Sequence, residues 1–265
     1  WFSTLHNLQT SSGHAFGSLF PVMNLYLEVN SSDLIDDAKK LSLELNLQLI
    51  ESQEKNNEDY FFVLSKERTY LRKGLSPSSK PIFSDFDFWT SNYDDKLLKN
   101  CFKGIANDFT CLDLTAGFGK DALEISKLPL CKSITLIEKE KWLFKLLEDG
   151  IKRSTKPSTK DLLLKFKPIC QDSAVFLKNT HQKYEIIYID PMFIGVSKAK
   201  AKRHMQALRD LNLVDESHGL LKASLDNALN RVIVKRHKNM PYLDEILPSR
   251  SISGKVVRFD IYNSN

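Results

Sequence analysis

The sequence predicts an α/β fold in which a small N-terminal α+β domain precedes a larger domain built on a parallel, doubly wound sheet. Three observations lead to this expectation. From residue 109 onward, short apolar runs alternate with segments of helical apolar spacing. A turn containing two glycines joins the first run to the first of these segments. Two runs near the end predict an antiparallel hairpin at the edge of the sheet. We expect the domains to cover residues 1–90 and 91–265.

The composition is that of a globular protein. Of the 265 residues, 42% are hydrophobic and 27% are charged, which excludes disordered and collagen-like chains. The net charge of +5 suggests, mildly, a polyanionic partner. The four cysteines form no CxxC pair and the six histidines lack zinc-ligand spacing, so we expect no metal. With neither a signal segment nor an apolar run of about 18 residues, we expect a cytoplasmic protein without membrane contact.

The N-terminal domain is expected to contain three strands and one helix. Residues 1–20 give no element, and a Ser/Pro-rich stretch covers 74–81. The helix is expected to open at Ser32 or Asp33, either of which suits an N-cap. The predicted elements are a strand at 22–29, a helix that continues to Leu49, and strands at 60–64 and 69–72 that pair as a hairpin.

The larger domain is expected to alternate strands and helices. Its predicted helices cover residues 93–106, a segment beginning at 121, 142–151, 173–179, about 198–213 and 217–229. Its predicted strands cover 109–114, 133–137, 163–169, 185–189 and 231–235, followed by the hairpin at 251–262.

The glycine turn, Thr115–Gly119, is the first candidate binding element. Glycines allow a sharp bend and a close ligand approach, although a tight turn that binds nothing is an equal alternative. Glu138 ends the next strand about 20 residues later, where nucleotide-binding folds place an acid on the ribose. A third glycine is missing, so S-adenosylmethionine (SAM) is a better expected ligand than NAD. Asp172-Ser173, after the third strand, can contact the adenine, cap a helix, or do both.

The candidate catalytic motif is Asp190-Pro191-Met192-Phe193, which follows the fourth strand at the carboxyl edge of the sheet. It resembles the (N/D)-P-P-(Y/F) motif of methyltransferases that act on exocyclic or amide nitrogens, with Met192 in place of the second proline. Asp190 and the Pro191 carbonyl can accept hydrogen bonds from an aryl amine and orient its lone pair, and Phe193 offers a stacking face. The alternative is an Asp-Pro pair that merely ends a strand.

Two basic runs lie close to this edge, and we expect them to contact RNA phosphates. A solvated charged face is the alternative for either run alone. The expected RNA-binding residues are Lys198, Lys200, Lys202 and Arg203 in the first run and Lys235 and Arg236 in the second.

Five strings carry a family resemblance: LDLTAGFGKDALEIS, LIEKE, IIYIDPMF, VIVKR and VVRFDIY. In this order and spacing they resemble the RsmJ family of bacterial 16S rRNA guanine-N2 methyltransferases, over roughly residues 60 to 262. The resemblance implies a Rossmann-like class I methyltransferase sheet closed by a C-terminal antiparallel hairpin. It also implies SAM-dependent methylation of a guanosine N2 in 16S rRNA, so the expected partner is that RNA or the small ribosomal subunit.

The resemblance also implies which residues bind the cofactor. The chain departs from the family pattern at Lys120 and Lys139, which replace arginines, and at Ile194, which replaces a proline. The same machinery acting on adenine N6 in DNA or on a protein glutamine remains an alternative, as does a non-catalytic RNA-binding protein. The full set of expected cofactor contacts is Asp113, Gly117, Gly119, Lys120, Asp121, Glu138, Lys139, Asp172, Ser173 and Asp190.

Overall fold

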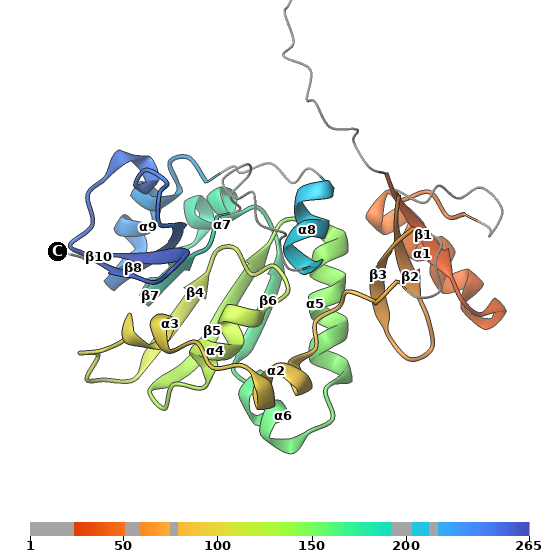
Figure 1. The fold of residues 1–265 in the computed structure, drawn as a ribbon, viewed down its shortest axis with the longest axis horizontal. Coiled ribbons are helices and arrows are strands. Elements are labelled where there is room, and N and C mark those ends of the chain that lie inside the picture. The colour runs from red at the N-terminus through yellow and green to blue at the C-terminus, as the bar shows by residue number, and fades with distance from the viewer. Residues whose placement is uncertain (1–23, 51–58, 75–78, 192–202, 212–216, 265) are drawn as a thin grey trace, which may run out of the picture.

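The computed structural model describes residues 24–50, 59–74, 79–191, 203–211 and 217–264. They form a three-stranded sheet of order β1-β2-β3 and a seven-stranded sheet of order β6-β5-β4-β7-β8-β10-β9 (Figure 1). In the larger sheet, β6, β5, β4, β7 and β8 are parallel, whereas β10 is antiparallel to both β8 and β9. The predicted fold class is therefore confirmed, including the C-terminal hairpin at the edge of the sheet.

The small sheet contains the predicted hairpin. Strand β2 (Tyr60–Leu64) pairs antiparallel with β3 (Thr69–Lys73) and parallel with β1 (Leu25–Val29). The parallel pairing requires a crossover between β1 and β2, and α1 (Ile35–Leu45) lies within it, after the short 3₁₀ helix η1 (Ser32–Leu34).

The predicted extent and cap of this helix were wrong. Helix α1 ends at Leu45 because Asn46 adopts a left-handed conformation (φ 53°), which asparagine tolerates better than most residues. Leu49 instead forms a β-bridge with Leu27. Ser32 and Asp33 lie inside η1, and no side chain caps α1.

The strands of the larger sheet follow one another along the chain as predicted. Its strands are β4 (Phe109–Asp113), β5 (Cys131–Glu138), β6 (Phe166–Cys170), β7 (Tyr184–Ile189), β8 (Ala228–His237), β9 (Arg250–Ser253) and β10 (Val257–Asn263). Its helices are α2 (Phe86–Asn92), α3 (Lys96–Asn100), α4 (Lys120–Ser126), α5 (Lys141–Arg153), α6 (Pro157–Leu163), α7 (Ser173–Asn179), α8 (Arg203–Asp210) and α9 (Leu220–Asn227), with the 3₁₀ helix η2 (Leu243–Glu245) before β9.

The prediction of a single helix over residues 93–106 was also wrong. Tyr93 has an extended conformation (φ −128°, ψ 132°) and separates α2 from α3. Asp85 and Asp95 each begin a helix by accepting a hydrogen bond from a backbone amide three residues later. Helix α6 was not predicted and shortens the following strand, which begins at Phe166.

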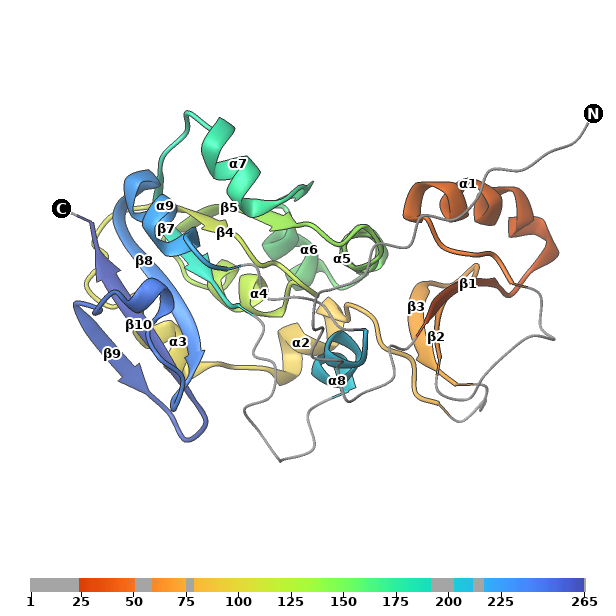
Figure 2. The same ribbon diagram turned by 90° about the horizontal axis from the view of Figure 1, so that it is seen from above.

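Alternate residues of the parallel strands pack on opposite faces of the large sheet. Ile186 and Tyr188 belong to one buried cluster with α4 and α5, whereas Ile187 and Ile189 belong to another with α7 and α9. Figure 2 shows α7 on one side of the sheet and α2 on the other. A sheet buried on both faces leaves the carboxyl ends of its strands as the accessible edge.

The small sheet lies beside α5 (Figure 1), and the core is continuous between them. Thr69 donates to Asp149 of α5 from both its backbone amide (3.1 Å) and its hydroxyl (3.2 Å). Phe86 of α2 packs edge-on against Phe166 of the large sheet, with ring centroids 5.8 Å apart. The boundary at residue 90 stays a prediction, and we propose that the larger unit begins at or before Phe86.

Among the described residues, no helix has the length and apolar character needed to cross a membrane. The same residues contain no group of three or more potential metal ligands.

Candidate functional site

A cavity of about 380 Å³ lies at the carboxyl ends of β4, β5, β7 and β8, within the size range of small-molecule sites. The structure brings most of the predicted site residues to its lining: Asp113, Gly117, Lys120, Asp121, Glu138, Lys139, Asp172, Ser173, Asp190, Pro191 and Lys235. Phe193, Lys198, Lys200 and Lys202 lie outside the described residues.

The two glycines of the turn have different surroundings. Both have positive φ, 54° at Gly117 and 79° at Gly119, which favours glycine. Gly117 lines the cavity and donates its amide to Glu138. At Gly119 an added Cβ would lie 2.7 Å from a Leu147 methyl and 2.9 Å from the Phe86 ring. Gly119 therefore allows α4 to pack closely on α5 and α2, and is absent from the cavity lining.

Glu138 is buried, and its two carboxylate oxygens face different amides. Oε2 accepts from Gly117 N and Oε1 from Glu140 N, both at 2.9 Å. Burial raises the pKa of Glu138 to about 7, and these two hydrogen bonds oppose the rise. Each carboxylate oxygen can accept a further bond, so the group fits a ribose diol.

The part of the cavity around Glu138, which we call the nucleoside half, has a lining that suits a nucleoside. Ile137, Leu143 and Ala174 supply apolar lining beside the carboxylate of Glu138. Asp172 caps α7 by accepting from Val175 N at 2.9 Å, and the Ser173 hydroxyl donates to Leu114 O at 2.5 Å. The capping role considered for Asp172 is thus present, and both side chains still line the cavity. These residues fit SAM in polarity and size.

The other half of the cavity contains a buried ionic group, which we call the Asp121–Lys235–Asp190 group. Lys235 Nζ lies 2.6 Å from Asp121 Oδ2 and 2.8 Å from Asp190 Oδ2. The Tyr188 hydroxyl donates to the same Asp121 oxygen at 2.6 Å. The backbone amide of Asp190 donates to the Thr115 hydroxyl at 2.6 Å. The backbone amide and the carboxylate of Asp190 are therefore both held in place beside the glycine turn.

Charge and burial set the protonation of this group. Burial raises the pKa of Asp190 to about 6, and the Lys235 ammonium opposes the rise. Burial alone would lower the pKa of Lys235, but the two carboxylates raise it well above its ordinary value. Asp113, buried behind them, has a pKa raised to about 8, mainly by burial. At neutral pH, Asp190 is ionised and Lys235 is charged.

Sequence reasoning missed the partnership between Lys235 and Asp190, and missed Tyr188. The available signal was strand pairing: Ile189 of β7 lies opposite Val234 of β8, so the next residues, Asp190 and Lys235, are neighbours. Without knowledge of this register, Lys235 looked like the start of a basic surface run.

The second basic run does not form an outward-facing surface. β8 extends to His237, so Lys235 and Arg236 lie within the strand and not beyond it. Arg236 is buried and donates to Pro241 O from Nε and Nη2, at 3.2 and 3.1 Å. These internal partners argue against the predicted phosphate contacts of Lys235 and Arg236. Arg203, from the first run, is exposed at the start of α8.

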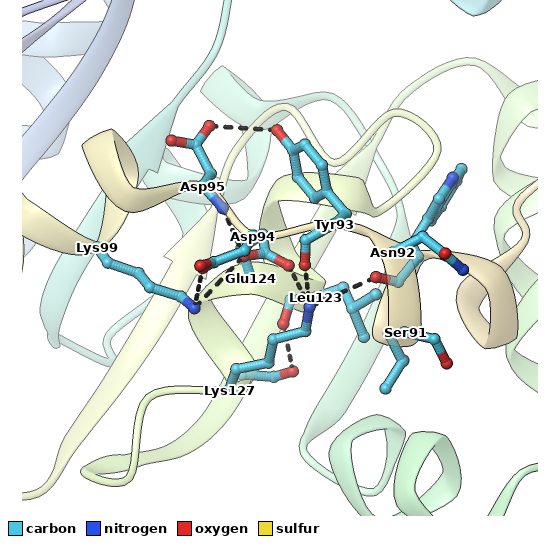
Figure 3. A network of polar contacts seen from close by, with 12 residues as sticks. Ser91, Asn92, Tyr93, Asp94, Asp95, Lys99, Leu123, Glu124 and Lys127 are labelled. Atoms are coloured by element: carbon cyan, nitrogen blue, oxygen red, sulfur yellow. Dashed lines mark hydrogen bonds and ion pairs between the residues drawn. The ribbon is translucent and has the colours of Figure 1, made fainter.

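An aromatic wall borders the ionic half of the cavity. Trp89 and Tyr93 line it, and Lys120 Nζ lies 3.5 Å from the centroid of the Tyr93 ring. Figure 3 shows how the chain around Tyr93 is held: Lys127, directly after α4, donates to Tyr93 O at 2.7 Å and pairs with the buried Glu124 of α4. Glu124 also accepts from the Asp95 amide at 2.9 Å. The wall is thereby tied to the helix that follows the glycine turn.

Helix α8 supplies a further wall through His204, Met205 and Leu208. The His204 ring packs edge-on against Phe118 of the glycine turn, 4.7 Å between centroids. At the far end of the helix, Asp210 accepts from Tyr60 OH and Lys73 Nζ, both at 2.9 Å. The small N-terminal sheet therefore anchors this wall of the cavity.

Known proteins resemble the chain over most of its length. A family model described as "Putative SAM-dependent methyltransferase" matches residues 42–264. The chain is similar to ribosomal RNA small subunit methyltransferase J of Hydrogenovibrio crunogenus, with 30% identity over 96% of each chain. The protein of the same name from Desulfotalea psychrophila is 38% identical over 156 residues, 58% of this chain and 59% of that relative. A crystal structure of a SAM-dependent methyltransferase from Neisseria gonorrhoeae has the same fold, with a TM-score of 0.67, 23% identity and coverage of 90% and 95%.

Proposed function

Since the chain belongs to the SAM-dependent methyltransferase family whose members include ribosomal RNA small subunit methyltransferase J, we propose that it methylates N2 of a guanosine in 16S rRNA. The observation that carries the proposal is the placement of Asp190. Asp190 directly follows β7, and its carboxylate lines the cavity beside the glycine turn and is ionised at neutral pH. An exocyclic amine needs such an acceptor, because its lone pair is delocalised into the base.

The residues around Asp190 support this chemistry. Bound SAM supplies a methyl group on a sulfonium sulfur, open to attack by a nitrogen lone pair. Asp190 and the carbonyl of Pro191 accept hydrogen bonds from the two N2–H groups, which directs the lone pair away from the base plane. As the N–C bond forms, the methyl C–S bond breaks and its electron pair stays on sulfur; positive charge then develops on N2, and the carboxylate of Asp190 stabilises it. The nitrogen then loses one proton, which Asp190 is placed to accept.

The nucleoside half of the cavity is the proposed cofactor site. Glu138 is proposed to accept from the ribose hydroxyls, with Gly117 and Lys139 beside it and Asp172 and Ser173 near the adenine. A ribosomal substrate also supports a cytoplasmic location and contact with RNA through the basic run that ends at Arg203. We propose that the partner is 16S rRNA or the small subunit that contains it.

The test compares the unmodified protein with Asp190→Asn in single-turnover methyl transfer at saturating SAM. Its substrate is 16S rRNA, or small subunits, from a strain that lacks the enzyme, and the product is mapped by mass spectrometry. We expect N2-methylguanosine at one position and a rate about 100-fold or more lower in the variant, because alignment and charge stabilisation are both impaired. The rate of the unmodified protein should also fall as the pH drops through about 6, where Asp190 protonates. If Asp190→Asn and the unmodified protein react at rates within a few-fold of each other, the proposed role of Asp190 is refuted.

A further inference from the structure

In the Asp121–Lys235–Asp190 group, the lysine ammonium has more N–H donors than its two ion pairs use. An ammonium has three N–H donors, and the two carboxylates account for two of them. Lys235 and Asp190 both line the cavity, and their side chains are 19% and 28% exposed. A donor and an acceptor 2.8 Å apart therefore face the same space.

The fold fixes this pair rigidly. Lys235 lies in β8, opposite Phe259 of β10 and one residue beyond Val234, which pairs with the last residue of β7. Asp121 is held in turn by the Tyr188 hydroxyl from β7. Because three elements position the ammonium, its direction relative to Asp190 is set before any substrate arrives.

Guanine has an edge that complements such a pair. Along this edge, O6 is a hydrogen-bond acceptor and the adjacent N1–H and N2–H groups are donors. Adenine presents an amino group where guanine has O6, and that group would face the ammonium without a partner. In the same pose adenine offers Asp190 only the lone pair of N1 and a C2–H group, so the carboxylate has no N–H to accept from and the ammonium faces an amino group. The ammonium and the carboxylate therefore select guanine together.

We propose that Lys235 is a specificity-determining residue that donates a hydrogen bond to O6 of the target guanine while Asp190 accepts from the adjacent N–H groups. The proposal rests on the proposed function and identifies how the same site selects its base. It replaces the phosphate contact predicted for Lys235 with a contact to the base itself.

The experiment uses 16S rRNA carrying either guanosine or 6-thioguanosine at the mapped position, prepared by ligation. Replacement of O6 by sulfur weakens the acceptor and leaves N1–H and N2 in place. We expect the unmodified protein to methylate 6-thioguanosine about tenfold or more slowly in single turnover, as for loss of a hydrogen bond to a charged group. In Lys235→Met, both substrates should react slowly but at rates within about twofold of each other, since the partner of O6 is gone.

Two further variants keep the comparison interpretable. Lys132→Met removes a lysine that pairs with Asp108 at the opposite, amino end of β5, and should retain the full preference for guanosine. Lys235→Gln keeps a neutral donor and should retain part of the preference. Should Lys235→Met fail to fold or turn over, the Lys235→Gln variant and the unmodified protein still decide the matter.

Equal rates on the two substrates in the unmodified protein would overturn the proposal, as would an undiminished preference in both Lys235 variants. Failure of the unmodified protein to methylate guanosine is a different result. It would refute the proposed function, and this inference with it.

Discussion

Replacement of Gly119 by alanine is expected to destabilise the protein by roughly 2–5 kcal/mol. The left-handed backbone at this position, with φ 79°, costs an alanine about 1–2 kcal/mol. The new methyl group would also lie 2.7 Å from Leu147 and 2.9 Å from Phe86, two residues of the core. Overpacking of this kind costs about 1–3 kcal/mol. The two contributions together give the expected range.

Gly104→Ala is the matched control, because Gly104 has φ 83° and nothing within 4 Å of the added Cβ. It should lose only the conformational contribution, about 1–2 kcal/mol. Urea unfolding of both variants measures the free energy of unfolding, provided the denaturant dependence stays unchanged. Equal losses in the two variants would show that Leu147 and Phe86 move aside at no cost, and would refute the packing argument.

Three further predictions concern the cofactor, the pH dependence and the RNA. Glu138→Ala should weaken SAM binding by about 1.5–3 kcal/mol in calorimetric titration, as for a charge-assisted hydrogen bond, and an unchanged affinity would remove Glu138 from the site. Burial raises the pKa of Asp113 to about 8, so the folded protein keeps a proton that the unfolded chain releases near its ordinary pKa of 3.8. The free energy of unfolding should therefore fall with rising pH, between 3.8 and about 8, more steeply in the unmodified protein than in Asp113→Asn, and parallel pH profiles would contradict this. Neutralising the first basic run should reduce the salt dependence of RNA binding by a slope of roughly 0.7–0.9 per lost phosphate contact and leave SAM affinity unchanged, whereas an unaltered slope would assign the run to a solvated face. That run is Lys198, Lys200, Lys202 and Arg203.

Local pattern was sufficient to predict the strands of the large sheet and their succession along the chain. The side chains of the central strands β4 and β7 are mostly buried on both faces, so these strands appear as apolar runs, and the last hairpin alternates. The ends of the helices were harder to predict. The end of α1 at Asn46 and the break at Tyr93 depend on single backbone conformations that neighbouring apolar residues do not reveal. Helix propensity averaged over several residues does not reveal the backbone conformation of one residue of this kind.

The cavity was partly predictable because parallel strands bring their carboxyl ends to one edge. Glu138 is the last residue of β5 and Asp190 directly follows β7, and the sequence placed both correctly at that edge. The position of Lys235 depends on which strand lies next to β7 and in what register, which is non-local information. The packing role of Gly119 was likewise hidden, since Phe86 and Leu147 are distant in the chain.

The anchoring of α8 on the small N-terminal sheet has a consequence for the order of folding. Asp210 contacts Tyr60 and Lys73 across 150 and 137 positions of sequence. Contacts of such separation close long loops and form late. During synthesis the small sheet emerges first, and its partner helix leaves the ribosome only after most of the chain has been made. The wall of the cavity that α8 supplies is then among the last parts to assemble. We therefore expect a chain that stops before α8 to lack a complete cavity, even with the glycine turn already in place.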